Sequence, residues 1–271
     1  MVLKMAAHGK RRVPAKLLVW CAALMLPIGL IFAWLTLDVD FRSRLASALI
    51  GQNAPQGAFE HRVRRYLLEH PEVIMEAINR LEARQREDGE TQAQAILESH
   101  ADEIFRDPDS PVGGNPGGDV TLVEFFDYNC PYCRQMVPVM VEAQKIDPKL
   151  RIVYKEFPIL GPNSLFAAKA ALAAHKQGKY VALHEALFQI RGTANADRVM
   201  EVAAKAGLDI ARLTADMADP AIQALLEKNL ALAQALRIDG TPGFVAGKRI
   251  LRGATDLNGL QLLIGEARAG R

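Results

Sequence analysis

The sequence has 271 residues, which is long enough for one large domain or for two small domains with appendages. Its 33 Lys and Arg residues are almost balanced by 31 Asp and Glu residues, for a net charge of +2. Such a balance argues against nucleic acid as a partner. The chain departs from this balance at its start, where Lys4, Lys10, Arg11, Arg12 and Lys16 occur with no acid among them.

An uncharged apolar stretch follows this basic cluster. Residues 17–37 (LLVWCAALMLPIGLIFAWLTL) would span roughly 30 Å as a helix, which matches the hydrocarbon core of a bilayer. Basic residues before such a span indicate the cytoplasmic side. We therefore predict a cytoplasmic N-terminus (1–16), a single inner-membrane anchor (17–37) in which Cys21 faces lipid, and a periplasmic remainder.

A cleaved signal peptide, which would release a soluble periplasmic protein, is the alternative interpretation of this stretch. The apolar region of a signal peptide is usually shorter, and its cleavage site follows closely. Here the nearest small-residue site, Ala46-Ser47-Ala48, is separated from the apolar run by four charged residues. These features favour the uncleaved anchor.

A helical segment is predicted after a linker at residues 38–58. Residues 59–106 show a narrow apolar stripe that includes Val63, Ile74 and Ile78, a break at His70-Pro71 and an almost wholly polar middle. Because this stripe cannot form a compact core alone, we predict that the segment mediates homo-oligomerisation. Docking on the remainder of the chain and a loose tether are the alternatives.

The next stretch is rich in turn-forming residues. Residues 107–118 (DPDSPVGGNPGG) contain Pro, Gly, Asp and Asn at most positions. This composition predicts a second linker, with a catalytic domain at residues 119–271.

Two cysteines mark the start of that domain. The β-prone run 120–126 (VTLVEFF) leads into Cys130-Pro131-Tyr132-Cys133, and a helical pattern follows. The cysteines therefore lie where a strand meets a helix N-terminus, and the helix dipole favours a thiolate at Cys130. A zinc site would need a second pair of ligands, and the histidines have no suitable spacing. Redox chemistry without a metal or other cofactor is the favoured interpretation.

The rest of the chain completes an α/β pattern. A second strand at 150–157 forms a parallel unit with the first, a helical region covers about 163–237, and a β-hairpin with Gly247-Lys248 at its turn precedes a last helix. This order predicts a thioredoxin fold with a helical insertion, preceded by the transmembrane helix and the helical N-terminal segment.

Three features together resemble the DsbA-like family of extracytoplasmic thiol-disulfide oxidoreductases. They are the run from Glu124 to Cys133, the size of the helical insertion, and the motif from Gly240 to Phe244 (GTPGF). The anchor and residues 63–82 (VRRYLLEHPEVIMEAINRLE) resemble the branch that contains Com1-like envelope proteins and the copper-tolerance protein ScsC.

The resemblance implies a role for each matching residue. Cys130 would be the attacking thiolate and Cys133 the resolving thiol of a redox-active disulfide. Thr241 and a cis Pro242 would present backbone to a substrate strand, beside Pro131 and Tyr132. An ordinary trans turn at Thr241-Pro242 is the alternative.

Glu124 matches the position of a buried acid in this family. The resemblance implies that Glu124 shuttles the proton of Cys133. A simple ion pair with Lys155 on the neighbouring strand is the other interpretation.

The function implied is the formation or isomerisation of disulfides in thiol-containing envelope proteins, with a membrane redox partner that resets the pair. Strong oxidases of the family carry histidine in place of Tyr132, so we expect a milder oxidant here. Two alternatives remain open. One is a reductase that serves metal tolerance or cytochrome maturation, and the other is a non-enzymatic envelope protein that binds Cu(I).

Overall fold

The structure is a computed structural model that describes residue 44 and residues 56–270. The predicted cytoplasmic N-terminus, the anchor at 17–37 and Cys21 therefore lie outside the described residues. Within the described part of the chain, no helix is both long and apolar enough to cross a membrane. The chain divides between Arg80 and Leu81 into two compact units.

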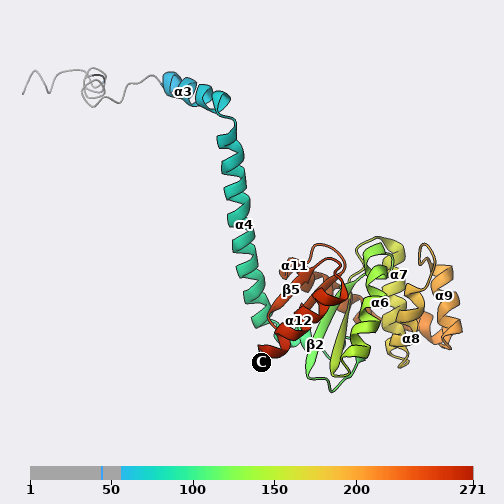
Figure 1. Ribbon diagram of the computed structural model, residues 1–271. Helices are drawn as coiled ribbons and strands as arrows, with labels where there is room; N and C mark the ends of the chain where they lie inside the picture. The colour runs from blue at the N-terminus through green and yellow to red at the C-terminus, as the bar shows by residue number, and fades with distance from the viewer. Residues whose placement is uncertain (1–43, 45–55, 271) are drawn as a thin grey trace, which may run out of the picture. The chain divides into compact units, whose positions relative to one another are not determined.

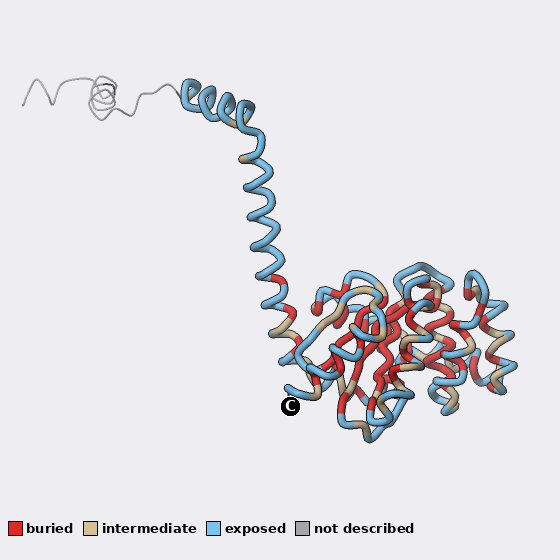
Figure 2. The backbone as a smooth tube through the Cα atoms, viewed as in Figure 1, coloured by how far each residue is buried: buried red, intermediate tan, exposed pale blue. Residues whose placement is uncertain are grey.

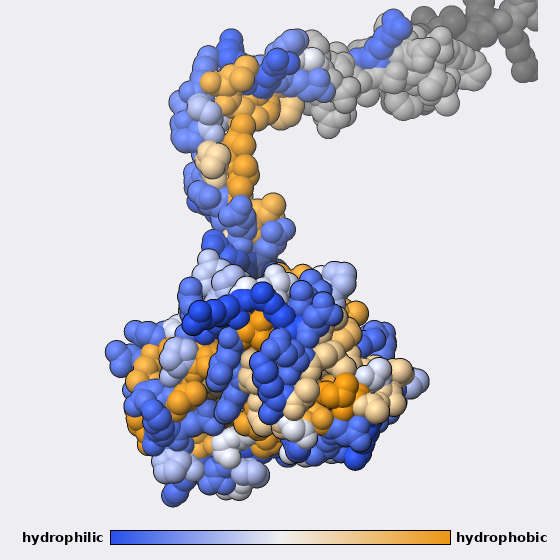
Figure 3. All heavy atoms as spheres, turned by 90° about the vertical axis from the view of Figure 1, so that its right-hand side faces the viewer, coloured by the Kyte–Doolittle hydropathy of each residue, from blue (hydrophilic) through white to orange (hydrophobic). Residues whose placement is uncertain are grey.

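The first unit contains helix α3 and the start of helix α4, whose remainder belongs to the second unit. Helix α3 covers Gln56–Glu69 and α4 covers Glu72–Ser99, so the predicted break at His70-Pro71 is confirmed. Their large apolar side chains are exposed, and Figure 3 shows them as a hydrophobic stripe along these helices. The exposed apolar residues of the two helices are Phe59, Val63, Tyr66, Leu68, Ile74, Met75, Ile78 and Leu81.

The second unit is built on a five-stranded sheet with the order β1-β3-β2-β4-β5. Figure 1 labels two of its strands, β2 and β5. The strands are β1 (Val112–Gly114), β2 (Val120–Phe126), β3 (Leu150–Glu156), β4 (Gly243–Ala246) and β5 (Arg249–Arg252). Strands β2 and β3 are parallel, while β4 is antiparallel to both β2 and β5. The predicted parallel unit and the predicted C-terminal hairpin are both confirmed.

Helices surround this sheet and form the predicted insertion. Helix α6 (Pro131–Ile146) follows β2 and α12 (Leu257–Ala269) ends the chain, while α7 to α11 lie between β3 and β4. The insertion helices are α7 (Pro162–His175), α8 (Tyr180–Phe188), α9 (Ala196–Lys205), α10 (Ile210–Asp216) and α11 (Pro220–Ala235). Asn195, Asp209 and Asp256 cap α9, α10 and α12 with their side chains, because each accepts a backbone N–H of the first turn.

The sheet separates two hydrophobic cores, because successive side chains of a strand point to opposite faces. Leu122 and Phe126 of β2 face the core shared with α6, α7, α8 and α12. Val123 and Phe125 face the core shared with α4, α5 (Ala101–Phe105) and α11. Figure 2 shows the buried residues, in red, concentrated in the interior of the sheet unit.

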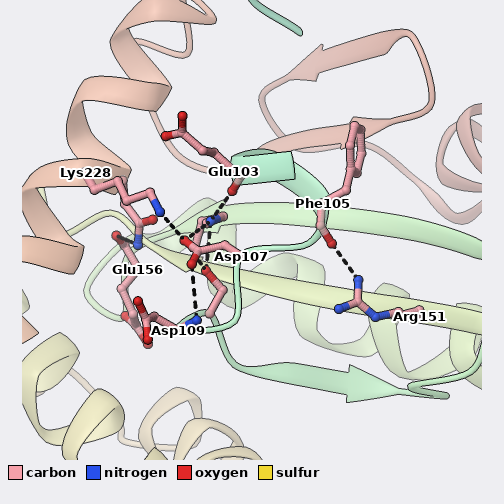
Figure 4. A network of polar contacts seen from close by, with 10 residues as sticks. Glu103, Phe105, Asp107, Asp109, Arg151, Glu156 and Lys228 are labelled. Atoms are coloured by element: carbon pink, nitrogen blue, oxygen red, sulfur yellow. Dashed lines mark hydrogen bonds and ion pairs between the residues drawn. The ribbon is translucent and has the colours of Figure 1, made fainter. Parts of the chain in front are cut away.

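The stretch predicted as a linker at residues 107–118 is instead part of the sheet unit. Residues 112–114 form β1, which pairs antiparallel with β3. Upstream of β1, Asp107 and Ser110 are buried and both bind the Nζ of Lys155, at 3.1 and 2.8 Å. Lys228 also pairs with Asp107, and the Lys155 Nζ donates to the carbonyl oxygen of Glu103 (Figure 4). The polar groups of this stretch are therefore satisfied by the domain.

The second half of α4 also belongs to the sheet unit, which corrects the prediction of one oligomerisation segment over 59–106. Ala93 and Leu97 are buried, and Leu97 joins the core beside α11. A side chain at Gly89 would clash with the guanidinium of Arg237, whose Nη1 donates to the carbonyl oxygen of Gln85. Gly89 thus permits a close approach of Arg237 to the helix.

Candidate active site

Cys130 and Cys133 lie at the junction of β2 and α6, as predicted. Cys130 is the residue before the helix, with extended backbone, and Pro131 occupies the first helical turn. The two cysteines are present as thiols, with exposed fractions of 4% and 1%. In contrast, Tyr132 is 60% exposed, so the dipeptide between the cysteines reaches the surface.

The Thr241-Pro242 loop packs against the first cysteine. The Cys130 Sγ donates a hydrogen bond of 3.2 Å to the carbonyl oxygen of Thr241, and the peptide bond between Thr241 and Pro242 is cis. Residues separated by 111 positions in the sequence thus meet at one point. A side chain at Gly243 would meet Ile238 at 2.5 Å, which explains why the motif continues with glycine.

Asp127 shapes the turn before Cys130, and the sequence analysis did not identify it. Its carboxylate accepts hydrogen bonds from the backbone N–H of Asn129 at 2.8 Å and of Leu160 at 3.0 Å. Its carbonyl oxygen accepts the N–H of Cys130 at 3.1 Å. Asp127 therefore joins the cysteine turn to the loop after β3. The residue type is typical of turns, but its long-range partner is not visible in the sequence.

Burial raises the pKa of the Cys133 thiol above its ordinary value, and negative charge on Cys130 or Glu124 would raise it further. Hydrogen bonds involving Asp127 and Thr241 act in the opposite direction and are outweighed. Cys133 is thus held as a protonated thiol when the pair is reduced. A group that accepts or supplies its proton is needed for exchange.

Glu124 is the candidate for the group that exchanges a proton with Cys133. It is 4% exposed, lies on the same face of β2 as Leu122 and Phe126, and is paired in the sheet with Tyr154 and Phe244. Burial raises its pKa to about 8. A small cavity of about 40 Å³ lies beside Glu124 and is also bordered by Gln144, Tyr154 and Glu185.

The alternative ion pair between Glu124 and Lys155 does not form. Lys155 is in register with Phe125, and its side chain lies on the opposite face of the sheet, bound to Asp107. The alternation of side chains along a strand explains this separation, because Tyr154 and not Lys155 shares the face of Glu124.

A second buried polar cluster lies on the same face of the sheet and was not predicted. The Glu156 Oε1 accepts hydrogen bonds from the hydroxyls of Tyr128 at 2.9 Å and Tyr180 at 2.7 Å. The Tyr128 hydroxyl also contacts the Nδ1 of His184 at 3.0 Å. Burial raises the pKa of Glu156 above its ordinary value and lowers that of His184 to about 3, so the His184 imidazole is neutral near pH 7.

This cluster links the insertion to the cysteine turn, since Tyr180 and His184 belong to α8 and Tyr128 precedes Cys130 by two residues. The sequence carried one signal for it. Lys155 and Glu156 are adjacent charged residues at the end of a β-prone strand, and such residues need partners on opposite faces when the strand is buried.

Comparison with known proteins places these features in a family. A model described as the DSBA-like thioredoxin domain matches residues 121–265, and the N-terminal domain of copper resistance protein ScsC matches residues 56–87. The first curated relatives matched are Na⁺/H⁺ antiporters named NhaA, for example from Salinispora arenicola (29% identity over 60% of this chain). The chain spans only about a quarter of the length of these relatives.

Other relatives match more of their own length. The thiol:disulfide interchange protein DsbA of Bordetella parapertussis is 28% identical over 52% of this chain and 69% of its own. A thioredoxin-like oxidoreductase from Silicibacter pomeroyi is 48% identical, with a TM-score of 0.61 over 62% of this chain and 97% of its own. Proteus mirabilis ScsC in a transitional conformation is 30% identical, with a TM-score of 0.61 over 81% and 97% of the two chains. Since the first family model covers more than half of the sequence, the chain belongs to the family of DSBA-like thioredoxin domains.

Proposed function

We propose that the chain is an extracytoplasmic thiol-disulfide oxidoreductase that forms or isomerises disulfides in envelope proteins. The observation that carries the proposal is the contact between the Cys130 Sγ and the carbonyl oxygen of Thr241 beside cis Pro242. It brings a cysteine at a helix start to a loop that can present backbone to a substrate strand. The match to a DSBA-like domain supports the same activity.

In the oxidising direction, the reaction begins with a disulfide between Cys130 and Cys133. A client thiolate attacks the Cys130 Sγ, the bond between the two cysteines breaks, and Cys133 leaves with the electron pair. A second client thiol, after losing its proton, attacks the client sulfur of the mixed disulfide. The client gains one disulfide, and the enzyme pair gains two electrons and two protons.

Glu124 supplies a proton to the leaving group, Cys133, in this scheme. Because burial raises the pKa of Cys133, its thiolate is a poor leaving group unless a proton arrives as the bond breaks. Glu124, with a pKa of about 8, holds a proton at neutral pH and can release it. In the reverse direction, the ionised Glu124 takes the proton of Cys133 as the enzyme disulfide forms.

Thr241, Pro242, Pro131 and Tyr132 form the surface that meets the client. The Thr241 carbonyl accepts the Cys130 thiol in the reduced protein and becomes available when that thiol loses its proton or is oxidised. Exposed Pro131 and Tyr132 then contact the client beside the reacting sulfur.

Isomerase activity is supported by the exposed stripe of α3 and α4. Apolar residues on helices that bury little surface are suited to pairing with a second copy of the same helices. Self-association would bring two or more cysteine pairs to one client, so that a mispaired protein is held during reshuffling. We assign this homo-oligomer contact to residues 56–81, since the later part of α4 packs on the sheet unit.

A reductase is the second candidate, and the match of residues 56–87 to a copper resistance protein favours it. A reductase that serves metal tolerance or cytochrome maturation would be stored as the dithiol. Trapping of thiols in intact cells, followed by a mobility shift, distinguishes the two roles. A reduced pair supports the reductase, and a disulfide supports the oxidase. Tight Cu(I) binding without thiol exchange would instead identify a metal-binding protein.

The proposed location is the periplasm, with the anchor at residues 17–37 in the inner membrane and a membrane redox partner that resets the cysteine pair. An oxidising compartment is where an enzyme disulfide persists.

Refolding of scrambled ribonuclease tests the proposed activity. The full-length protein and a Cys21→Ser variant should restore ribonuclease activity at equal rates, because Cys21 lies far from the pair in sequence. Cys130→Ser should abolish the activity, and Cys133→Ser should accumulate mixed disulfides with the client because the resolving thiol is missing. Equal inactivity of the full-length protein and Cys130→Ser would refute the proposed function.

A further inference from the structure

An open groove is lined by the two residues that flank the first cysteine in the sequence. Among the described residues, six line it, and its volume is about 520 Å³. Asn129 and Pro131, the two neighbours of Cys130 in the sequence, form one wall, and the loop at Gly192-Thr193 forms the other. A molecule whose sulfur reacts with Cys130 would therefore extend into this groove.

Arg134 is the charged residue in the lining. Its guanidinium contacts the carbonyl oxygens of Ile190, Tyr128 (3.4 Å) and Gly192 (3.3 Å), which fix it between α6 and the loop after α8. Within the described part of the chain, Arg134 makes no ion pair with a carboxylate. Carbonyl oxygens satisfy hydrogen bonds but do not neutralise a full positive charge, so the groove keeps this charge.

A second cation, Arg198, lies near the groove, and Glu201, the acid that interacts with it, is also paired with Lys205. The Nη1 of Arg198 lies 3.3 Å from the position that a side-chain carbon would occupy on Gly192. The acid closest to Arg134 in the sequence, Asp127, is 1% exposed, and its two carboxylate oxygens accept the N–H groups of Asn129 and Leu160. The Asp127 carboxylate is thus bound to backbone N–H groups and does not pair with Arg134.

The groove wall is also held rigidly. The Asn129 Oδ1 accepts the N–H of Ala194 at 2.8 Å, and its Nδ2 donates to the Ser164 Oγ at 3.2 Å. These bonds connect the cysteine turn to the loop and to α7. A binding surface of this kind loses little conformational entropy when a ligand arrives.

We propose that this groove binds a carboxylate of the thiol or disulfide substrate whose sulfur reacts with Cys130. The inference rests on the proposed function and adds a substrate class to it, namely cysteines that have an acidic group nearby. Oxidised glutathione and a protein segment with acids beside its cysteine share this chemistry. A carboxylate in the groove faces Arg134 while its disulfide lies at Cys130.

Reaction rates with small disulfides of different charge test the proposal. The reduced enzyme gives two electrons to the disulfide, its own pair becomes oxidised, and two small thiols are released, so the reaction can be followed by quenched-flow trapping. The rate constant for oxidised glutathione, an anion, is divided by that for the neutral bis(2-hydroxyethyl) disulfide. This ratio removes effects on the intrinsic reactivity of Cys130.

Gln135 provides a variant that changes the groove charge and keeps the Arg134 contacts, because it is exposed and lines the groove. Gln135→Glu should lower the ratio about two- to threefold and Gln135→Lys should raise it similarly, as expected for a unit charge at about 8 Å in water. Both effects should shrink at 1 M salt. The matched control is Gln261→Glu, the same substitution at an exposed position of α12, which should keep the original ratio.

A second arm compares two peptides that contain a disulfide, one with Glu and one with Lys beside the cysteine. If the enzyme prefers the Glu peptide and Gln135→Glu reduces this preference, the site also binds protein clients. If only glutathione is preferred, the site binds the small thiol alone. If Gln135→Glu and Gln261→Glu behave alike with every substrate, the groove proposal is wrong while the proposed function stands. If the full-length protein reacts with none of the disulfides, the proposed function itself fails.

Discussion

Glu124 and Tyr154 are partners across strands β2 and β3, and both border the same small cavity. The pKa of Tyr154 is raised by burial, and a negative charge on Glu124 raises it further. Neither side chain is paired with a cation among the described residues. Ionisation of Glu124 in the folded protein is therefore unfavourable, and this affects both stability and exchange.

The first prediction concerns stability against pH. The pKa of Glu124 is about 8 in the folded protein and near 4.5 when unfolded. Below pH 4.5 both states are protonated and the group has no effect. As the pH rises from 4.5 to 8, the unfolded state loses its proton first, so the folded protein loses stability on the order of 4 kcal/mol. Glu124→Gln should remove this part of the dependence in urea unfolding at pH 5 and pH 8.5.

The matched control for this prediction is Glu185→Gln, the same substitution at an exposed acid that borders the same cavity. It should retain the original dependence on pH. An unchanged slope in Glu124→Gln would show that this carboxyl is not held protonated. In ribonuclease refolding, Glu124→Gln should also slow the release of mixed disulfides, because the amide cannot supply a proton to Cys133.

The second prediction concerns the buried pair of Lys155 and Asp107, which have exposed side-chain fractions of 0% and 1%. Lys155→Met should reduce the free energy of unfolding by about 3–5 kcal/mol, because a buried carboxylate loses a partner. Lys228→Met should have a smaller effect, since the Lys228 side chain is 36% exposed. The double variant Lys155→Met with Asp107→Leu should recover most of the loss. Denaturant unfolding measures all three, and a double variant no better than Lys155→Met would contradict the assignment.

The sequence was sufficient to predict the thioredoxin fold with its helical insertion because the strongest signals for it are local. A CxxC between a β-prone run and a helical pattern, a Thr-Pro before a hairpin, and the turn at Gly247-Lys248 each depend on residues that are close in the chain. The CxxC pattern located Cys130 and Cys133, whereas the cis Pro242 was implied by the resemblance to the DsbA-like family. The helical insertion followed from the periodicity between these points.

The errors arose where a residue's environment depends on distant partners. Val112–Gly114 has no strand pattern, and it becomes a strand because the backbone of β3 offers an open edge. Asp107 resembles a solvent-exposed turn residue until Lys155, 48 positions away, is placed beside it. The hydrogen bonds of Tyr128 and Glu156 are invisible in the sequence for the same reason.

The third prediction compares two helical glycines. A side chain at Gly57 of α3 would meet nothing within 4 Å, whereas at Gly89 of α4 it would displace Arg237. Gly57→Ala should therefore increase helicity slightly in circular dichroism without weakening the sheet unit, because alanine favours helix over glycine. Gly89→Ala should lose this gain and increase proteolysis near Gln85. Equal effects of the two substitutions would argue against the close contact of Gly89.

The fourth prediction concerns self-association. Ile78 is 41% exposed on the apolar stripe of α4, and its neighbour Asn79 is also exposed. Ile78→Lys should lower the molecular mass in sedimentation to that of a monomer and reduce refolding of scrambled ribonuclease, while Asn79→Lys should preserve both. A monomeric parent protein would refute the proposed self-association. An unchanged molecular mass in Ile78→Lys would show that the contact between copies does not involve this stripe.

Strand β3 carries Tyr154, Lys155 and Glu156 in succession, and each of the last two enters a different polar network on a different face. If β3 slipped by one residue, the side chains of Lys155 and Glu156 would move to the opposite faces of the sheet, so Lys155 would leave Asp107 and Glu156 would leave the two tyrosines. Each buried network would then lose one of its hydrogen-bonding partners. The register of β3 is thus constrained on both faces of the sheet, by a cation on one face and an acid on the other, and a misaligned sheet would be destabilised on both faces.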